Sequence, residues 1–596
     1  MKSLLPHHSS SYLYMHISNY ISRIVRRPKV YYNELMLSLQ SLYRNYIKKE
    51  LPYFCVLSIL IILASVAMFH DGFFRTFDDV TTVRIIDMAK ELQREGWYNN
   101  FPVRMSAELS HGFGYPLYLF YGNLPYYVGA LIKMITGINH ISVTKLVYLF
   151  PLVAGPILFY AAARFKMKPF YGLIAGCLYT LFPYRGYGIY IKGGTGEAWA
   201  MAFMPGLFIG LFLMENKKSY GLIVFAIFFL LSVISHPLAG LQAVALAVLY
   251  GLFFIPQKRQ FLLSVLLGLG LAAFNLIPSF YYLKTVQITF RENNITALID
   301  NLVPWHKLVV PDFVINVDKP FSSLFFPIII FGLIAVCLNY KTLNGKKMWP
   351  LIFFGIISLT LYLLVSDSTR FFWTLTQSIT GVLQTSTRLF TILSFTIPFF
   401  VGLYLPLIAN KLLRLGLIML VIFVSLSSLA VFKPVKYSYF YEYKAEGPCA
   451  TTTWQDEYLP KWVKVCPPKE LQANMVLQGD GKLVISKNTL LDMEAVVVNK
   501  KPSDLIVHRY YFPGWDIYMD GQKSKLDYTF SPYGIFKTKI PEGTHKINVV
   551  YRKTLIMVIS DIITLVSIVI LMLLSLKNNI LRSGRFKSRN SSFLSK

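Results

Sequence analysis

Charge is scarce in this chain, and acidic charge is the scarcest. Only 15% of the 596 residues are charged, with 30 acidic against 59 basic side chains, whereas 55% are hydrophobic. A soluble globule of this size needs more polar surface than this composition supplies, so the sequence excludes a soluble protein. Apolar runs of roughly 20 residues, long enough to cross a hydrocarbon core, recur along the chain and predict membrane-spanning helices.

The excess of basic residues does not indicate nucleic-acid binding. The formal net charge is +29, but the Lys and Arg residues gather in the amino-terminal arm, the short loops between apolar runs and the carboxy-terminal tail. This is the positive-inside distribution of a membrane protein, and we expect no nucleic-acid partner. Because no small-residue cleavage site follows the first apolar run, that run is predicted to be a signal anchor.

Loop charge orients about twelve predicted spans. With the basic arm in the cytoplasm, the loops ENKKS, PQKRQ, KTLNGKK and NKLLR and both termini also fall on the cytoplasmic side. This parity requires the Tyr-, Pro- and Gly-rich segment 116–136 to lie at the outer interface without crossing. The expected spans are 53–69, 142–163, 170–184, 198–214, 219–235, 238–255, 261–283, 322–340, 349–365, 388–409, 413–432 and 554–577.

The part of the chain before the last span has the composition of a small β-sandwich. Short runs rich in Tyr, Val and Ile are separated there by turn signals such as Asp520-Gly521. The predicted parts are a basic cytoplasmic arm at 1–50, a transmembrane core at 51–432 with its first outer loop at 70–141, an extracytoplasmic β-rich domain at 433–553, a last helix at 554–577 and a basic cytoplasmic tail at 578–596.

Cysteine is rare, and only two of the five cysteines lie outside predicted spans. Cys449 and Cys466 are 17 positions apart in the outer domain. In an oxidising compartment they are expected to form a disulfide, with Cα atoms less than about 7 Å apart. Two free thiols remain the alternative, because the sequence does not give their separation in space.

Two adjacent carboxylates follow the first span. Asp78 and Asp79 are predicted to lie close to the membrane surface, where such a pair is costly unless it binds a cation, takes up a proton or accepts hydrogen bonds. The alternative is that one of them caps the helix beginning at VTTVR. For Asp79 capping and catalysis stand as equal interpretations.

Seven motifs together resemble a known family. In order they are FDDVTTVRIIDMAKELQREGWY, GYPLYLFYGNLPYY, GGTGEAWAMAFMPG, SHPLAG, LQTSTRLF, TTTWQDEYLPKWV and YYFPGWDIYMDG. This series resembles the YfhO-like, or 6-pyruvoyl-tetrahydropterin synthase-related, bacterial membrane proteins. The resemblance implies a GT-C-type fold and a multi-pass enzyme of the bacterial inner membrane that uses polyprenyl-phosphate sugars at the outer face. It does not imply pterin chemistry.

The resemblance also implies a role for the acidic pair. In the GT-C superfamily an acidic residue near the end of the first span acts as catalytic base or binds a metal, and Asp78 or Asp79 occupies that place. A carboxylate within reach of an acceptor hydroxyl can take its proton as the sugar is transferred. If a divalent cation such as Mg²⁺ or Mn²⁺ takes part, these two residues are its expected ligands.

Other polar residues at the predicted outer face are candidates for binding substrate or phosphate. Basic residues there break the positive-inside trend, and Arg pairs well with phosphate oxygens. Snorkelling to water or binding ordinary lipid headgroups is the alternative for each Arg, a helix start for Glu197, and a structural hydrogen bond for His236 in its tight turn. The candidates are Arg84, Glu197, His236 and Arg388.

The sequence therefore predicts a glycosyltransferase with lipid bilayer around it, a polyprenyl-phosphate-linked sugar as donor and an envelope glycan, lipid or protein as acceptor. A lipid-linked-glycan transporter is the first alternative, but the sequence shows neither two similar halves nor ionisable residues at mid-membrane. A non-catalytic membrane scaffold that binds glycan is the second, and the residues alone leave it open.

The topology can be tested directly. A reporter enzyme fused after residue 500 should be active only as a periplasmic form, because loop charge places 433–553 outside. Activity of a cytoplasmic reporter at the same position would contradict the whole assignment of sides.

Overall fold

The computed structural model describes most of the chain from residue 48 onward. The described residues are 48–77, 80–106, 108–288, 298–311, 315, 320–438, 449–453, 456–468, 471 and 474–591. They belong to two compact units, Met1–Ile59 and Leu60–Lys596. The first contributes only the start of helix α3 (Lys48–Ser65), so the description below concerns the second.

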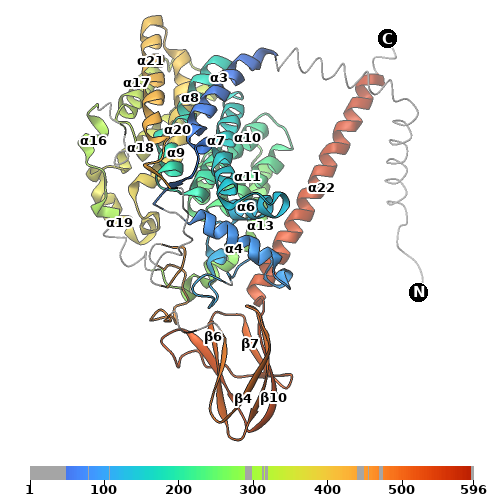
Figure 1. The fold of residues 1–596 in the computed structure, drawn as a ribbon. Coiled ribbons are helices and arrows are strands. Elements are labelled where there is room, and N and C mark those ends of the chain that lie inside the picture. Colours follow the sequence, from blue (N-terminus) through green and yellow to red (C-terminus); the bar gives the residue numbers. More distant parts are fainter. Residues whose placement is uncertain are drawn as a thin grey trace. The chain divides into compact units, whose positions relative to one another are not determined.

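Long apolar helices dominate this unit (Figure 1). Among the described residues, eight helices are long and apolar enough to cross a membrane, or nine if a bent pair counts as one span. The predicted helical membrane class is therefore confirmed. The eight are centred on α3, α7 (His140–Ala163), α10 (Thr195–Glu215), α12 (Pro237–Phe254), α18 (Gly345–Leu364), α20 (Phe390–Tyr404), α21 (Lys411–Ser427) and α22 (Leu555–Ser591). Adjoining short turns lengthen three of these spans, to Lys49–Phe69 at α3, Ser386–Leu407 at α20 and Lys411–Val431 at α21.

The remaining predicted spans are helices of a different kind. The span expected at 261–283 is broken, because α13 (Lys258–Leu271) and α14 (Ala273–Tyr282) meet at an angle of 67°. Three more helices are shorter than the roughly 20 residues that a perpendicular crossing needs, so the total of twelve spans stays a prediction. They are α8 (Pro169–Thr180), α11 (Gly221–Ser235) and α17 (Phe325–Leu338).

The segment 116–136 is divided between two helices. A four-residue turn, α5 (Leu117–Phe120), precedes α6 (Leu124–Thr136), which packs on α4 (Thr81–Gln93) and α7. Thirteen residues of helix rise about 20 Å, less than the thickness of a hydrocarbon core. This length agrees with a segment that does not cross. Three further short helices are α9 (Pro183–Tyr190), α16 (Trp305–Val309) and α19 (Arg370–Thr380).

A two-sheet antiparallel sandwich precedes α22 (Figure 1). Its sheets have the orders β4-β5-β10-β7-β8 and β3-β6-β9, and they share one apolar core. Asp520 and Gly521 form the turn between β7 and β8 with φ angles of 49° and 83°, as expected for a two-residue hairpin. The strands are β3 (Met475–Gln478), β4 (Gly481–Asn488), β5 (Asp492–Asn499), β6 (Ser503–Tyr510), β7 (Trp515–Met519), β8 (Gln522–Ser524), β9 (Ile535–Ile540) and β10 (Gly543–Tyr551).

Described residues at the beginning of the predicted β-domain pack on the first outer loop. Strand β1 (Phe73–Arg75) pairs with β2 (Lys436–Ser438), so the chain after α21 returns to the chain after α3. The hydroxyl of Ser110 then donates to the carbonyl of Cys449 at 2.8 Å. The first described strand of the sandwich begins at Met475.

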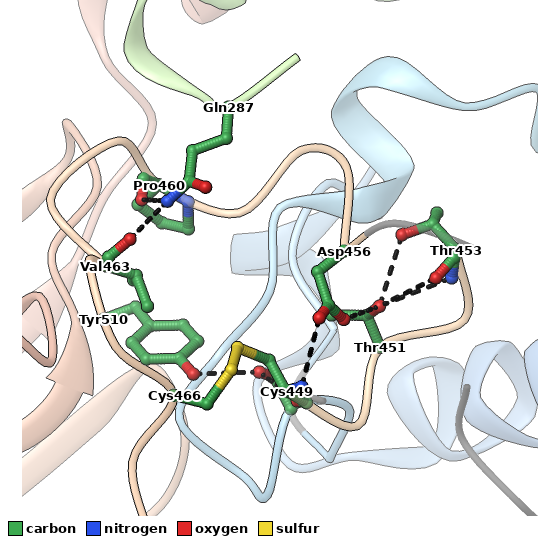
Figure 2. The surroundings of a disulfide bond; sticks show 10 residues. Gln287, Cys449, Thr451, Thr453, Asp456, Pro460, Val463, Cys466 and Tyr510 are labelled. Atoms are coloured by element: carbon green, nitrogen blue, oxygen red, sulfur yellow. Dashed lines mark hydrogen bonds between the residues drawn. A yellow bond between two sulfur atoms is a disulfide. The ribbon is translucent and has the colours of Figure 1, made fainter. Parts of the chain in front are cut away.

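A disulfide joins Cys449 and Cys466, with Cα atoms 5.0 Å apart, within the reach expected from the sequence. Figure 2 shows Asp456 beside this bond, where its carboxylate accepts from Thr451 Oγ1 at 2.6 Å and from the backbone N–H of Cys449 at 3.2 Å. Since both sulfur atoms are in the disulfide, the cluster of Cys449, Asp456 and Cys466 offers no thiolate to a metal.

A buried ion pair fastens the first outer loop to the last helix. Arg104, whose side chain is 5% exposed, contacts Asp561 of α22 at 2.5 Å and donates to the carbonyl of Phe274 at 3.1 Å. Lys553 shares the same carboxylate at 2.9 Å. These contacts join the first outer loop, the bent pair and α22 at one place.

Replacing Asp561 with Ala should destabilise the protein. The substitution leaves the Arg104 guanidinium buried without its counter-ion, which typically costs about 3–5 kcal/mol. Thermal unfolding of the detergent-purified protein would measure the loss. Asp516→Ala is the matched control, because Asp516 pairs at 2.6 Å with an exposed lysine, Lys523, and an exposed pair contributes less than about 1 kcal/mol. Equal effects of the two substitutions would contradict the role of the buried pair.

Candidate functional site

All four candidate binding residues line one pocket, called the cationic pocket below. Arg84, Glu197, His236 and Arg388 line it together, although they come from four separate segments of the chain. Tyr121, Tyr126, Lys192 and the Gly193–Gly196 loop complete most of its wall.

The acidic pair Asp78 and Asp79 lies outside the described residues. The next two residues, Val80 and Thr81, line the pocket. The N-cap position of α4 is Val80, whose side chain cannot accept a hydrogen bond. The helix therefore begins one residue later than the sequence suggested. The capping, catalytic and metal-binding roles of Asp78 and Asp79 stay predictions.

Arg84 is buried and held in place from several sides. Its side chain lies 4.0 Å over the ring of Tyr121, and it donates to the hydroxyl of Tyr126 at 2.9 Å. It also donates to the hydroxyl and the carbonyl of Thr452, in the TTTWQDEYLP motif. Snorkelling does not apply to Arg84, because its exposed fraction is 2%. Three of the five N–H donors of the guanidinium are used by the bonds to Tyr126 and Thr452.

Glu197 is a positioning residue at the start of α10. Its Oε1 accepts from Tyr184 of α9 at 3.0 Å and from Thr391 of α20 at 2.8 Å, while its Oε2 pairs with Lys192. The carboxylate therefore joins the ends of three helices and holds the Lys192 ammonium at the pocket. With its oxygens occupied in this way, it is poorly placed to act as a base.

His236 combines the structural role foreseen for it with a place on the pocket wall. At the junction of α11 and α12, its Nδ1 accepts from the backbone N–H of Ala239 at 3.1 Å. Burial, and after it the nearby Arg388, lowers the pKa of His236, so the imidazole is neutral. Because Nδ1 accepts, the proton is assigned to Nε2, which makes Nε2–H the donor available to a ligand.

Two glycines allow the turn that carries His236 to approach. A Cβ at Gly122 would lie 2.1 Å from the carbonyl oxygen of Ser235, and one at Gly196 would lie 2.5 Å from the same atom. Any side chain at either position would displace the turn. The glycines of FYGNLP and GGTG thus have a physical reason that the sequence alone did not supply.

A chain of hydroxyl groups connects α4 to the start of α10. Thr81 Oγ1 lies 2.6 Å from Thr195 Oγ1 and 3.0 Å from the hydroxyl of Tyr148, which donates to the carbonyl of Gly193 at 2.9 Å. This network fixes the glycine loop against the first turn of α4. It keeps Arg84 and Lys192 on the same pocket.

Arg388 completes the positive charge of the pocket. It is half-buried in the turn η7 (Ser386–Leu389), where it donates to the side chain of Gln384. Among the described lining residues Arg84, Lys192 and Arg388 are cationic and only Glu197 is anionic, so two positive charges are in excess. The pocket is therefore suited to an anionic group such as a phosphate.

Two further buried residues, Arg185 and Asp87, do not line the pocket. Arg185, another basic residue at the predicted outer face, is buried elsewhere and donates to the carbonyls of Tyr179 and Pro151. Asp87 of α4 is buried, and burial followed by the nearby Glu91 raises its pKa to about 7. From the sequence, Asp87 could complete a metal or sugar site in the first outer loop, but an ordinary solvated side chain was the favoured interpretation. Its burial contradicts that interpretation.

The described pocket residues do not by themselves form a metal site. Glu197 is the only carboxylate among them, and it is paired with Lys192. A divalent cation would need further oxygen ligands.

Comparison with protein families identifies the family of the chain. A model of the 6-pyruvoyl-tetrahydropterin synthase related domain, described as a membrane protein, matches residues 118–435. The chain belongs to this family. An uncharacterized protein of Lactococcus lactis subsp. cremoris (strain MG1363) is 27% identical over 349 residues, which are 54% of each chain. The chain thus spans about half the length of that relative.

Solved structures of glycosyltransferases show weaker similarity. Arabinofuranosyltransferase AftD from Mycobacteria has 14% identity and a TM-score of 0.43, covering 64% of this chain and 27% of its own. Oligosaccharyltransferase AglB from Archaeoglobus fulgidus has 11% identity and a TM-score of 0.42, covering 65% and 56%. ArnT from Cupriavidus metallidurans bound to undecaprenyl phosphate has 10% identity and a TM-score of 0.30, and the match covers 65% of this chain and 78% of ArnT. Similarity of this extent does not establish an activity.

The Lys192–Glu197 pair can be tested by a double-mutant cycle. Glu197→Gln should lower the free energy of unfolding by about 3 kcal/mol, because it leaves a largely buried ammonium without its partner. Lys192→Met in the same chain should recover most of this loss. Thermal unfolding in detergent would measure all three variants. Strictly additive effects would mean that the pair does not stabilise the pocket.

Proposed function

We propose that this protein is a membrane glycosyltransferase that moves a sugar from a polyprenyl-phosphate donor to an envelope glycan, lipid or protein acceptor. The observation that carries the proposal is the convergence of Arg84, Lys192 and Arg388 on one pocket. The proposed location is the outer face of the bacterial inner membrane, with both termini in the cytoplasm. The motifs shared with the family and the positive-inside loops support it.

The position of the pocket suits the phosphate of a lipid carrier. The Gly193–Gly196 loop leads into the amino terminus of α10, and Arg388 lies just before α20, both apolar helices of spanning length. A phosphate attached to a lipid tail lies where such helices end. The positive end of the α10 dipole and the guanidinium groups both stabilise an anion there.

The proposed reaction is a single substitution at the anomeric carbon. The acceptor hydroxyl oxygen forms a bond to that carbon, and the bond from the carbon to the phosphate oxygen breaks. The electron pair of the broken bond goes to the lipid phosphate, where Arg84 and Arg388 stabilise the charge, and Nε2–H of His236 supplies a hydrogen bond. The proton of the acceptor goes to a carboxylate of the Asp78–Asp79 pair.

Substitution of the acidic pair and of Arg388 tests different steps. Asp78→Asn should lower turnover by roughly 100-fold or more, because it keeps the shape but removes the proton acceptor, and Asp79→Asn should have the smaller effect. Arg388→Ala should instead weaken donor binding through lost phosphate contact. The measurement is transfer of labelled sugar from a polyprenyl-phosphate donor in liposomes, with donor affinity measured separately.

Arg370→Ala is the matched control for Arg388. Arg370 has a 56% exposed side chain, lies outside the pocket lining and is 3.9 Å from Asp300, so its loss should leave donor affinity unchanged. Full activity of the double Asp→Asn variant would reject catalysis at the pair. That outcome would favour a protein that binds or scaffolds glycan without transferring it.

A further inference from the structure

We propose that a second cavity, between the first outer loop and the sandwich, binds the oligosaccharide acceptor. The cavity measures about 630 Å³, within the range of about 300–1,000 Å³ that is typical of ligand pockets. This inference rests on the proposed function, since it assigns the acceptor class and the place where that acceptor is held. It concerns residues to which the sequence gave no chemical role, although Trp97 and Tyr98 end the first of the seven motifs.

Two parts of the chain that are distant in sequence form the cavity. One wall is the segment 91–100, from the end of α4 through Trp97 and Tyr98. The other wall comes from the β4–β5 hairpin and the end of β10, including Asp492 and Arg552. Neither part encloses a cavity alone, so the first outer loop and the sandwich bind a ligand only as a pair.

The lining has the chemistry that recognises a saccharide. The rings of Trp97 and Tyr98 are 44% and 66% exposed, so their faces can stack on the C–H groups of a sugar ring. Around them lie side chains of both charge signs, including Glu95 and Arg552, together with the amide of Asn99. Such a mixture of donors and acceptors matches hydroxyl groups better than it matches a lipid tail or a simple anion.

Helix α4 connects this cavity to the cationic pocket. Thr81 and Arg84 near its start line the pocket, and Glu91 and Arg94 at its end line the cavity. Ten residues of helix separate Arg84 from Arg94, which corresponds to roughly 15 Å along the axis. An oligosaccharide held in the cavity can therefore extend along α4 toward the transferred sugar.

The experiment measures glycan binding directly on the purified full chain in detergent. An array of neutral and uronic-acid-containing oligosaccharides identifies a bound glycan, and its affinity is then measured in solution without donor. Trp97→Ala should weaken binding by roughly 10-fold through lost stacking. Trp305→Ala is the matched control, because Trp305 is 54% exposed and lies outside the cavity lining, and it should bind normally.

Tyr98→Ala separates binding from folding. The Tyr98 side chain is 66% exposed, so its loss should leave thermal stability unchanged while glycan binding weakens roughly 3- to 10-fold through lost stacking. Unchanged affinity in both Trp97→Ala and Tyr98→Ala would overturn the inference. So would strong quenching of Trp97 fluorescence by brominated lipid, which would identify Trp97 as a membrane anchor.

The two proposals fail in different ways. Trp97→Ala should keep its affinity for undecaprenyl phosphate, and Arg388→Ala should keep its affinity for the glycan, because each residue lies at a different site. Sugar transfer by a protein that binds no glycan at this cavity would overturn the inference and leave the glycosyltransferase intact. Glycan binding that depends on Trp97, in a protein without transferase activity, would support the inference and reject the transfer.

Discussion

The burial of one guanidinium group governs the assembly of the candidate site. A buried charge is stable only when its donors are satisfied, and the partners of Arg84 are Tyr126 of α6 and Thr452, which is 368 residues away in the chain. These contacts require the first outer loop, the amphipathic segment after it and the disulfide-bonded segment to meet. The Cys449–Cys466 bond holds Thr452 in a short closed loop and so limits where that partner can lie.

The same loop organises the part of the molecule that we assign to the acceptor. Helix α4 runs from the cationic pocket to the second cavity, and Arg104 fastens the loop beyond it to Asp561 of the last helix. The sandwich is thereby held beside α4 at one wall of the cavity. A transferase needs donor phosphate and acceptor at a defined separation, and a single rigid helix between two sites provides it.

Particular elements show how far local sequence reasoning reached. The hairpin at Asp520-Gly521 was predictable because only a few residue pairs accept two positive φ angles, and the long apolar helices were predictable because partition into lipid depends on each segment's own composition. The 67° bend at Ala272 and the short length of α11 were not. Those features depend on neighbouring helices, which can support a broken or short apolar segment inside a bundle.

For the site, the sequence by itself determined the chemical types: scarce acidic residues after the first span, and arginines where the positive-inside rule does not expect them. It could not show that Arg84, His236 and Arg388 share a pocket, or that Glu197 forms an ion pair with Lys192. Composition acts on one segment at a time, whereas these facts depend on which helix ends and loops meet. Only the packing of the whole chain decides that.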